Sequence, residues 1–221
     1  MKPSLNSTPI LLFVLITLVI TSCKKNNEKP VTYPLNFYAE RIEVVSETRM
    51  FTQDGEIKDA QKIAEFTANM DDYFKAENNL YDKGELYVTL TSKEKAIFKG
   101  YNYGFDVSQN GDQHLYKSEA KIILPPIIND HFTSHILKHQ SATTEIPGSG
   151  RILREMRVSY GDEKEMQFPI IAYATLSVVE EHTIIKTGRI SNNEFNESVI
   201  SQLRANETLA VKTYMVICKA K

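Results

Sequence analysis

The chain has 221 residues, 42% of them hydrophobic and 24% charged, and its 26 basic and 28 acidic side chains give a formal net charge of −2. This composition is that of a globular protein with room for one substantial core, not of a disordered chain. The near balance of charge argues against the clustered basic face that binds nucleic acid or an anionic membrane surface, so no nucleic-acid partner is expected.

The first 23 residues have the order of a bacterial export signal. Lys2 precedes an apolar run at residues 10–20, about eleven residues long, which is within the range of a signal-peptide core. The run is too short to cross a hydrocarbon layer, which needs about twenty apolar residues. Ser22 and then Cys23 follow the run, and a polar, basic stretch comes next. A cysteine placed directly after small residues resembles the lipobox of bacterial lipoproteins.

This resemblance implies that residues 1–22 are a signal peptide and that the Cys23 thiol carries a diacylglyceryl group. The new amino terminus would be acylated, with palmitate or a similar chain. Two or three chains hold a protein to a membrane far more firmly than one chain, so the expected membrane contact is this lipid. Residues 23–35 contain two prolines and are predicted to be a flexible tether.

A short lipobox leader, an Asn/Lys-rich tether and a Tyr-rich β domain together resemble the envelope lipoproteins of Bacteroidota. The resemblance implies a place in the cell envelope and carries no catalytic residue. Surface-exported members of that group tend to have acidic residues soon after the cysteine. Here Lys24 and Lys25 follow Cys23, and Glu28 is the first acid. We therefore expect an outer-membrane anchor that faces the periplasm.

Residues 36–221 are predicted to form a single β-rich domain, because most segments alternate and are rich in β-branched and aromatic residues. Residues 125–150 are the least regular part, either a long loop with a short helix or a boundary between subdomains. Turn signals stand at Asp54-Gly55 and Asn110-Gly111. The expected strands are 37–45, 49–52, 85–91, 96–98, 101–107, 113–124, 152–160, 170–179, 183–187 and 209–219.

Two helices are expected, at residues 59–75 with Asp59 as the N-cap and at residues 193–203. In both, apolar residues recur every three or four positions, which predicts packing on the core. The predicted fold class is mainly β, a β-rich α+β arrangement. It would be an antiparallel sandwich or a partly closed barrel of about nine strands, with the two helices over a face or an open end.

Cys23 and Cys218 are the two cysteines of the chain. Lipidation would consume Cys23, so no intramolecular disulfide is expected. Cys218 lies in an apolar, strand-like run and is predicted to pack as a small hydrophobic residue.

Three histidines, His131, His135 and His139, recur at every fourth position. On a helix, His131 and His135 would lie close enough to share one Zn²⁺ or Cu²⁺ ion. A third ligand would have to come from another segment, for example His182. The alternative interpretation is a solvated polar face that binds no metal.

The sequence contains no G-x-S-x-G, G-x-x-x-x-G-K-[ST], H-E-x-x-H or G-x-G-x-x-G motif. Aromatic residues in neighbouring predicted strands could line an apolar cavity or pair across strands in an ordinary core. We therefore expect a non-enzymatic module, without a cofactor, that binds a small ligand or a partner protein at the cell envelope. The alternatives are a metal-assisted hydrolase that uses His131 and His135, and a purely structural envelope protein. The aromatic residues that could line a cavity or pair in the core are Tyr87, Tyr101, Tyr103, Phe105 and Tyr116.

Overall fold

The structure is a computed structural model that describes residues 30–68, 70, 74, 80–124, 135–142, 144–146, 150–179 and 182–221. The leader, Cys23 and His131 lie outside the described residues. Residues Thr32–Lys221 form one compact unit. Among the described residues, no helix is both long enough and apolar enough to cross a membrane.

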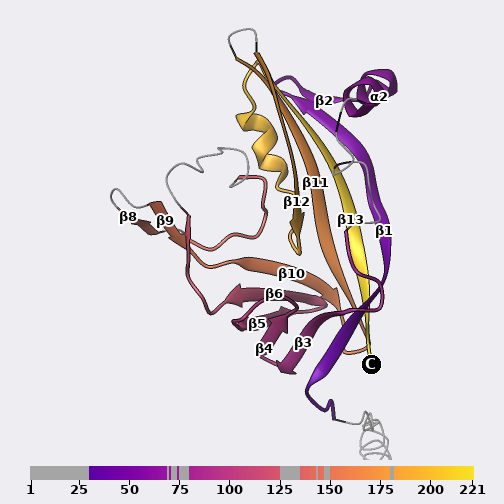
Figure 1. Ribbon diagram of the computed structural model, residues 1–221, viewed down its shortest axis with the longest axis vertical. Coiled ribbons are helices and arrows are strands. Elements are labelled where there is room, and N and C mark those ends of the chain that lie inside the picture. Colours follow the sequence, from indigo (N-terminus) through magenta and orange to yellow (C-terminus); the bar gives the residue numbers. More distant parts are fainter. Residues whose placement is uncertain are drawn as a thin grey trace, which may run out of the picture. The chain divides into compact units, whose positions relative to one another are not determined.

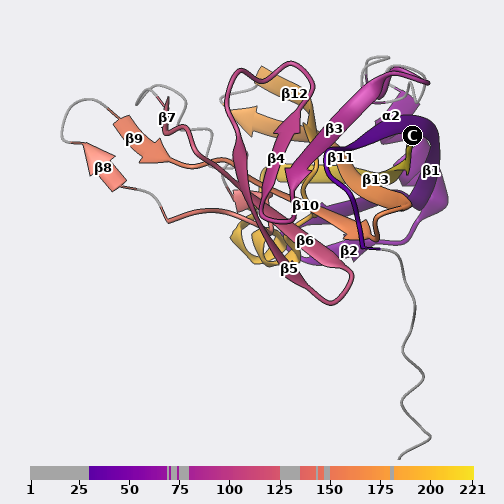
Figure 2. The same ribbon diagram turned by 90° about the horizontal axis from the view of Figure 1, so that it is seen from below.

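Eight antiparallel strands close into a barrel (Figure 1), which Figure 2 shows from below. The hydrogen-bonded order is β10-β6-β5-β4-β3-β1-β13-β11, and pairing of β11 with β10 closes the ring. The prediction of a mainly β fold is therefore confirmed. The ring consists of β1 (Leu35–Thr52), β3 (Leu86–Ser92), β4 (Lys95–Phe98), β5 (Phe105–Asn110), β6 (Gln113–Ser118), β10 (Met156–Gly161), β11 (Glu165–Val179) and β13 (Glu207–Ala220).

Five further strands and two helices complete the described elements. Strand β2 pairs with the end of β1, and β12 pairs with β11. The other three strands form a separate small sheet in the order β7-β9-β8. The bounds are β2 (Gly55–Ile57), β7 (Ile122–Leu124), β8 (Thr144–Ile146), β9 (Gly150–Leu153), β12 (His182–Ser191), helix α2 (Ala60–Ala68) and 3₁₀ helix η2 (Glu197–Gln202).

Several strand boundaries differ from those predicted. The predicted strands 37–45 and 49–52 form one continuous strand, β1. It was predicted as two because three register shifts against β13 interrupt its alternation of buried and exposed residues. The predicted strands 113–124 and 152–160 each divide in two, and their outer parts, β7 and β9, leave the barrel for the small sheet. Ser118 marks the division, since its hydroxyl donates to the Ala120 carbonyl at 2.7 Å and accepts from the Glu155 N–H at 2.8 Å.

The two helices occur where they were expected but are shorter. Asp59 caps α2, because its Oδ1 accepts from the backbone N–H groups of Gln61 and Lys62. The second helix was predicted from residue 193, but it is a 3₁₀ helix that begins at Glu197 with Asn196 as its cap. The preceding residues cannot be helical, since Phe195 forms a β-bridge with Leu137.

Aromatic side chains fill the barrel interior. The Phe98 ring contacts Phe105 and Tyr116 edge to face, with ring centroids 5.0 and 5.1 Å apart, and Phe168 at 5.9 Å. All four side chains are buried. A second buried cluster lies where the long strands extend past β10, and it includes Phe51, Ile171, Val199, Leu203 and Leu209.

Strand β11 changes its neighbour at Pro169. Gln167 pairs with β10, whereas Ile170 and the residues after it pair with β12. The two neighbouring strands therefore separate at this point, which we call the strand fork. Asn192, directly after β12, spans the fork: its N–H donates to the Pro169 carbonyl at 2.7 Å, and its carbonyl accepts from the Val158 N–H of β10 at 2.8 Å.

Candidate functional site

A pocket of about 260 Å³ lies at the strand fork, at the barrel end where β3 and β10 begin and β4 ends. Its lining combines aromatic and charged side chains from segments far apart in the sequence, including Tyr87, Phe98, Lys99, Tyr101, Arg157 and Asn192. We call it the Arg157 pocket. A concave site with apolar walls and a few convergent polar groups is the usual form of a small-molecule site.

Arg157 is the central residue of this pocket, and its side chain is only 7% exposed. The guanidinium carbon lies 4.3 Å from the ring centroid of Tyr101 and 4.5 Å from that of Phe98, so the cation stacks on both rings. Its Nε and Nη2 both donate to Oε1 of Glu155, at 2.8 and 2.5 Å. Nη2 also donates to the Tyr101 hydroxyl. The planar cation is therefore held in one orientation.

Asn192 lies beside Arg157 at the strand fork and is 2% exposed. Its φ of 62° is in the left-handed region, which asparagine tolerates better than most residues. The Tyr87 hydroxyl donates to Asn192 Oδ1 at 2.6 Å. Burial raises the pKa of Tyr87, so this hydroxyl remains protonated and able to donate at neutral pH.

Glu155 balances the charge of Arg157 from outside the pocket lining. The Tyr103 hydroxyl donates to its Oε2 at 3.2 Å. Burial, together with the nearby Glu155 charge, raises the pKa of Tyr103 to about 12, so Tyr103 stays neutral across the physiological range. The Arg157–Glu155 pair therefore has no net charge and is held from both sides.

Three donors at the floor of the pocket have no acceptor among the described residues. They are Nη1 of Arg157, Nδ2 of Asn192 and the hydroxyl hydrogen of Tyr101, whose oxygen already accepts from Arg157. Both side chains are largely buried, but these N–H groups are not among the enclosed, unpaired atoms of the described residues, so they remain accessible to an acceptor that enters the pocket. Two buried side chains with spare N–H groups in one pocket thus form a prepared site for an acceptor.

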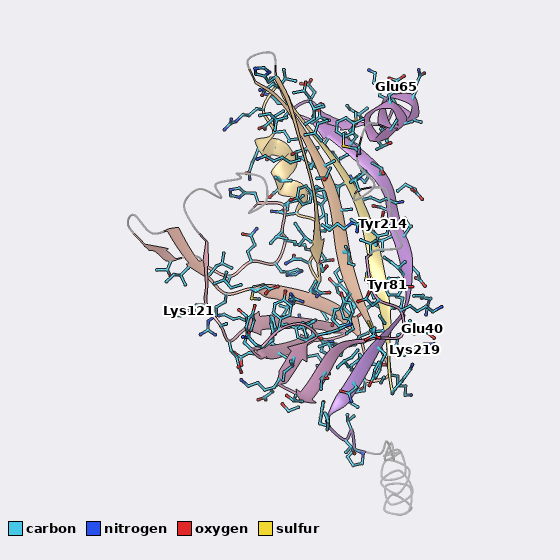
Figure 3. All side chains as sticks on the ribbon, in the orientation of Figure 1. Glu40, Glu65, Tyr81, Lys121, Tyr214 and Lys219 are labelled. Carbon is cyan, nitrogen blue, oxygen red and sulfur yellow. The ribbon has the colours of Figure 1, made fainter. Side chains whose placement is uncertain are left out.

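The rim of the pocket offers hydrogen-bond acceptors, whereas the floor offers donors. The Lys99 ammonium lies 3.3 Å from Glu85 Oε2 and 3.6 Å from Asp82 Oδ2, so two carboxylates share one cation. These carboxylates are 62% and 81% exposed, and water screens them. Tyr81, which is labelled in Figure 3, also belongs to the lining.

The structure does not test the predicted metal pair. His131 lies outside the described residues, and His135 is exposed. His139 does not follow His135 on a helix, because the residues after His135 are not helical. Within the described part of the chain, no three His, Cys, Asp or Glu side chains are grouped so that they could hold a metal ion. The assignment of His131 and His135 stays a prediction.

His139 instead belongs to a polar cluster around Glu194. Its Nε2 lies 2.8 Å from Glu194 Oε2, and the Lys138 ammonium lies 2.9 Å from the same oxygen. Burial by itself raises the pKa of Glu194, but hydrogen bonds from Lys138, His139 and Tyr160 outweigh it and lower the pKa. Because Lys138 and His139 both bond this carboxylate, the cluster fastens the 135–142 segment to the residues before η2.

The other predicted positions divide between core and pocket. Cys218 is fully buried as expected, and burial raises its thiol pKa to about 12. Phe105 and Tyr116 pack in the barrel core, whereas Tyr87 and Tyr101 line the pocket. Sequence reasoning missed Arg157 and its partner Glu155. The available signal was a cation inside the strand-like run of residues 156–160.

No protein-family model, no curated protein and no solved structure matches the chain.

Proposed function

We propose that the chain is a lipid-anchored protein of the cell envelope that binds a small ligand in the Arg157 pocket without transforming it. The observation that carries the binding proposal is the pair of buried side chains, Arg157 and Asn192, whose spare N–H groups converge on one pocket. Spare donors that line a pocket can bond an acceptor supplied by a ligand.

The chemistry of the lining favours holding a ligand over catalysis. Arginine keeps its proton at any physiological pH, and the amide of Asn192 does not titrate. Burial raises the pKa of Tyr87 well above neutrality, which makes it a poor general base. These groups position an acceptor and do not exchange protons with it.

The anchor is proposed from the leader alone. Cys23 would carry the lipid, and residues 23–35 would connect it to β1, with the domain on the periplasmic side of the outer membrane. Growth with labelled palmitate tests this: label should remain on the Cys218→Ser variant and disappear from Cys23→Ser. Equal labelling of both variants would refute the anchor. Protease treatment of intact cells tests the orientation, since digestion of the domain would place it outside.

Binding can be tested with the full-length ¹⁵N-labelled chain in detergent micelles. The Arg157 Nε–H and the Asn192 side-chain amide each give a resolvable ¹⁵N–¹H signal that reports on the pocket. A panel of small, rigid, polar fragments should contain compounds that shift both signals in a saturable way. The Asn206 amide, which is exposed and bonds the Val178 carbonyl, is the internal control and should not move. If no fragment moves the two pocket signals, the binding proposal is wrong.

A further inference from the structure

The floor of the Arg157 pocket offers donors without offering net charge. Arg157 is neutralised inside the protein, because Glu155 accepts from both its Nε and its Nη2. A second carboxylate on Nη1 would leave a net negative charge at a site where the Arg157 side chain is 7% exposed. Burying an unbalanced charge is costly. An uncharged oxygen acceptor, such as a carbonyl, avoids this cost and still satisfies the donors.

The rim complements the floor with acceptors. Asp82 and Glu85 share the single Lys99 ammonium, and an ionised carboxylate accepts about four hydrogen bonds. Lone pairs therefore remain for N–H groups of a ligand. Between rim and floor, Leu86, Tyr87 and Phe98 supply apolar and aromatic wall.

We propose that the ligand of the Arg157 pocket is a small uncharged amide. Its carbonyl oxygen accepts from the three floor donors, Arg157 Nη1, Asn192 Nδ2 and the Tyr101 hydroxyl, and its N–H group donates to the carboxylates of the rim. Its carbon frame lies against the aromatic wall. This assignment rests on the proposed function, since it names the chemistry of the ligand that the pocket binds.

Three compounds of nearly the same shape test the assignment on the full-length chain, with the Arg157 and Asn192 signals as the readout. Benzamide has both the carbonyl and the N–H group, acetophenone lacks the N–H group, and benzoate carries a charge. We expect benzamide to bind about tenfold or more tightly than benzoate, and more tightly than acetophenone. Benzoate or acetophenone binding as tightly as benzamide would overturn the amide assignment and leave the pocket a ligand site.

Two variants check that binding depends on the floor donors. Asn192→Asp keeps an acceptor for Tyr87 and tolerates the left-handed backbone, but removes the Nδ2 donor. Tyr101→Phe keeps the ring that stacks on Arg157 and removes only the hydroxyl. Each should weaken benzamide binding by about tenfold, whereas Tyr160→Phe, outside the lining, should not. If Asn192→Asp fails to fold, Tyr101→Phe decides alone, and unchanged affinity in it would overturn the assignment.

If none of the three compounds moves either signal, the fragment panel shows which proposal is wrong. If other fragments bind, the pocket is a ligand site and the amide assignment is wrong. If no fragment binds, the proposed function is wrong as well.

Discussion

Replacing Arg157 by methionine removes a buried cation while keeping most of the apolar stem. The variant loses the two hydrogen bonds to Glu155, the bond to Tyr101 and the stacking on Phe98 and Tyr101. Breaking a buried ion pair costs about 3–5 kcal/mol, largely because the other charge is left unpaired. The Glu155 side chain is 25% exposed, so water can partly resolvate it. We therefore expect the free energy of unfolding to fall by about 3 kcal/mol, at the lower end of that range.

Urea denaturation followed by far-ultraviolet circular dichroism measures this loss from the shift of the midpoint, provided that the m-value is unchanged. The double variant Arg157→Met/Glu155→Gln leaves no unpaired charge, so its cost should be only about 1–2 kcal/mol, which is less than the single variant's. A cost below about 1 kcal/mol for Arg157→Met would refute the reasoning. So would costs of the two single variants that simply add in the double variant.

Three further predictions concern other parts of the fold. A Cβ added at Gly188 would lie 2.3 Å from the ring of its cross-strand partner Tyr173, so Gly188→Ala should lower the unfolding free energy by about 1–3 kcal/mol. The same substitution should cost less in a Tyr173→Ala background, where the ring is absent. Cys218 should resist iodoacetamide until urea unfolds the chain, as mass spectrometry of its peptide would show; rapid native modification would contradict its burial. Because the folded-state pKa of Glu194 is lowered, its stabilisation is present above the ordinary value of 4.5 and is lost as pH falls through the folded-state pKa. Glu194→Gln should therefore lower the urea midpoint at pH 7, the difference should shrink as the pH falls below 4.5, and a pH-independent difference would exclude this cause.

The features of the fold that depend on residues close together in the sequence could be predicted. Alternation gave the positions of most strands, and Asp59 gave the start of α2, because both signals lie within a few residues. Closure of the barrel could not be predicted, since it depends on two residue pairs between β10 and β11, Tyr160 with Gln167 and Gly161 with Met166. The bulges of β1 hid its continuity, because each extra residue reverses the alternation.

The candidate site was harder to predict for a related reason. Arg157 is visible in the sequence as a cation within a strand, but the rings that enclose it come from residues 98 and 101, more than fifty positions earlier. Asn192 follows a strand and is typical of a turn, and its position across the strand fork depends on β10 and β11. Pockets built from distant segments leave no local pattern.

Strand β1 also determines how the domain would carry mechanical load. It is hydrogen-bonded to β13 from Phe37 opposite Ala220 to Phe51 opposite Leu209, and near its start it pairs with β3 as well. Interstrand hydrogen bonds lie across the strand direction. Tension applied to Leu35 along the axis of β1 would therefore load these bonds together in shear. A force across the strand would instead break these bonds one after another. A domain pulled along β1 from its N-terminal segment would therefore resist unfolding more strongly than one pulled across the strand.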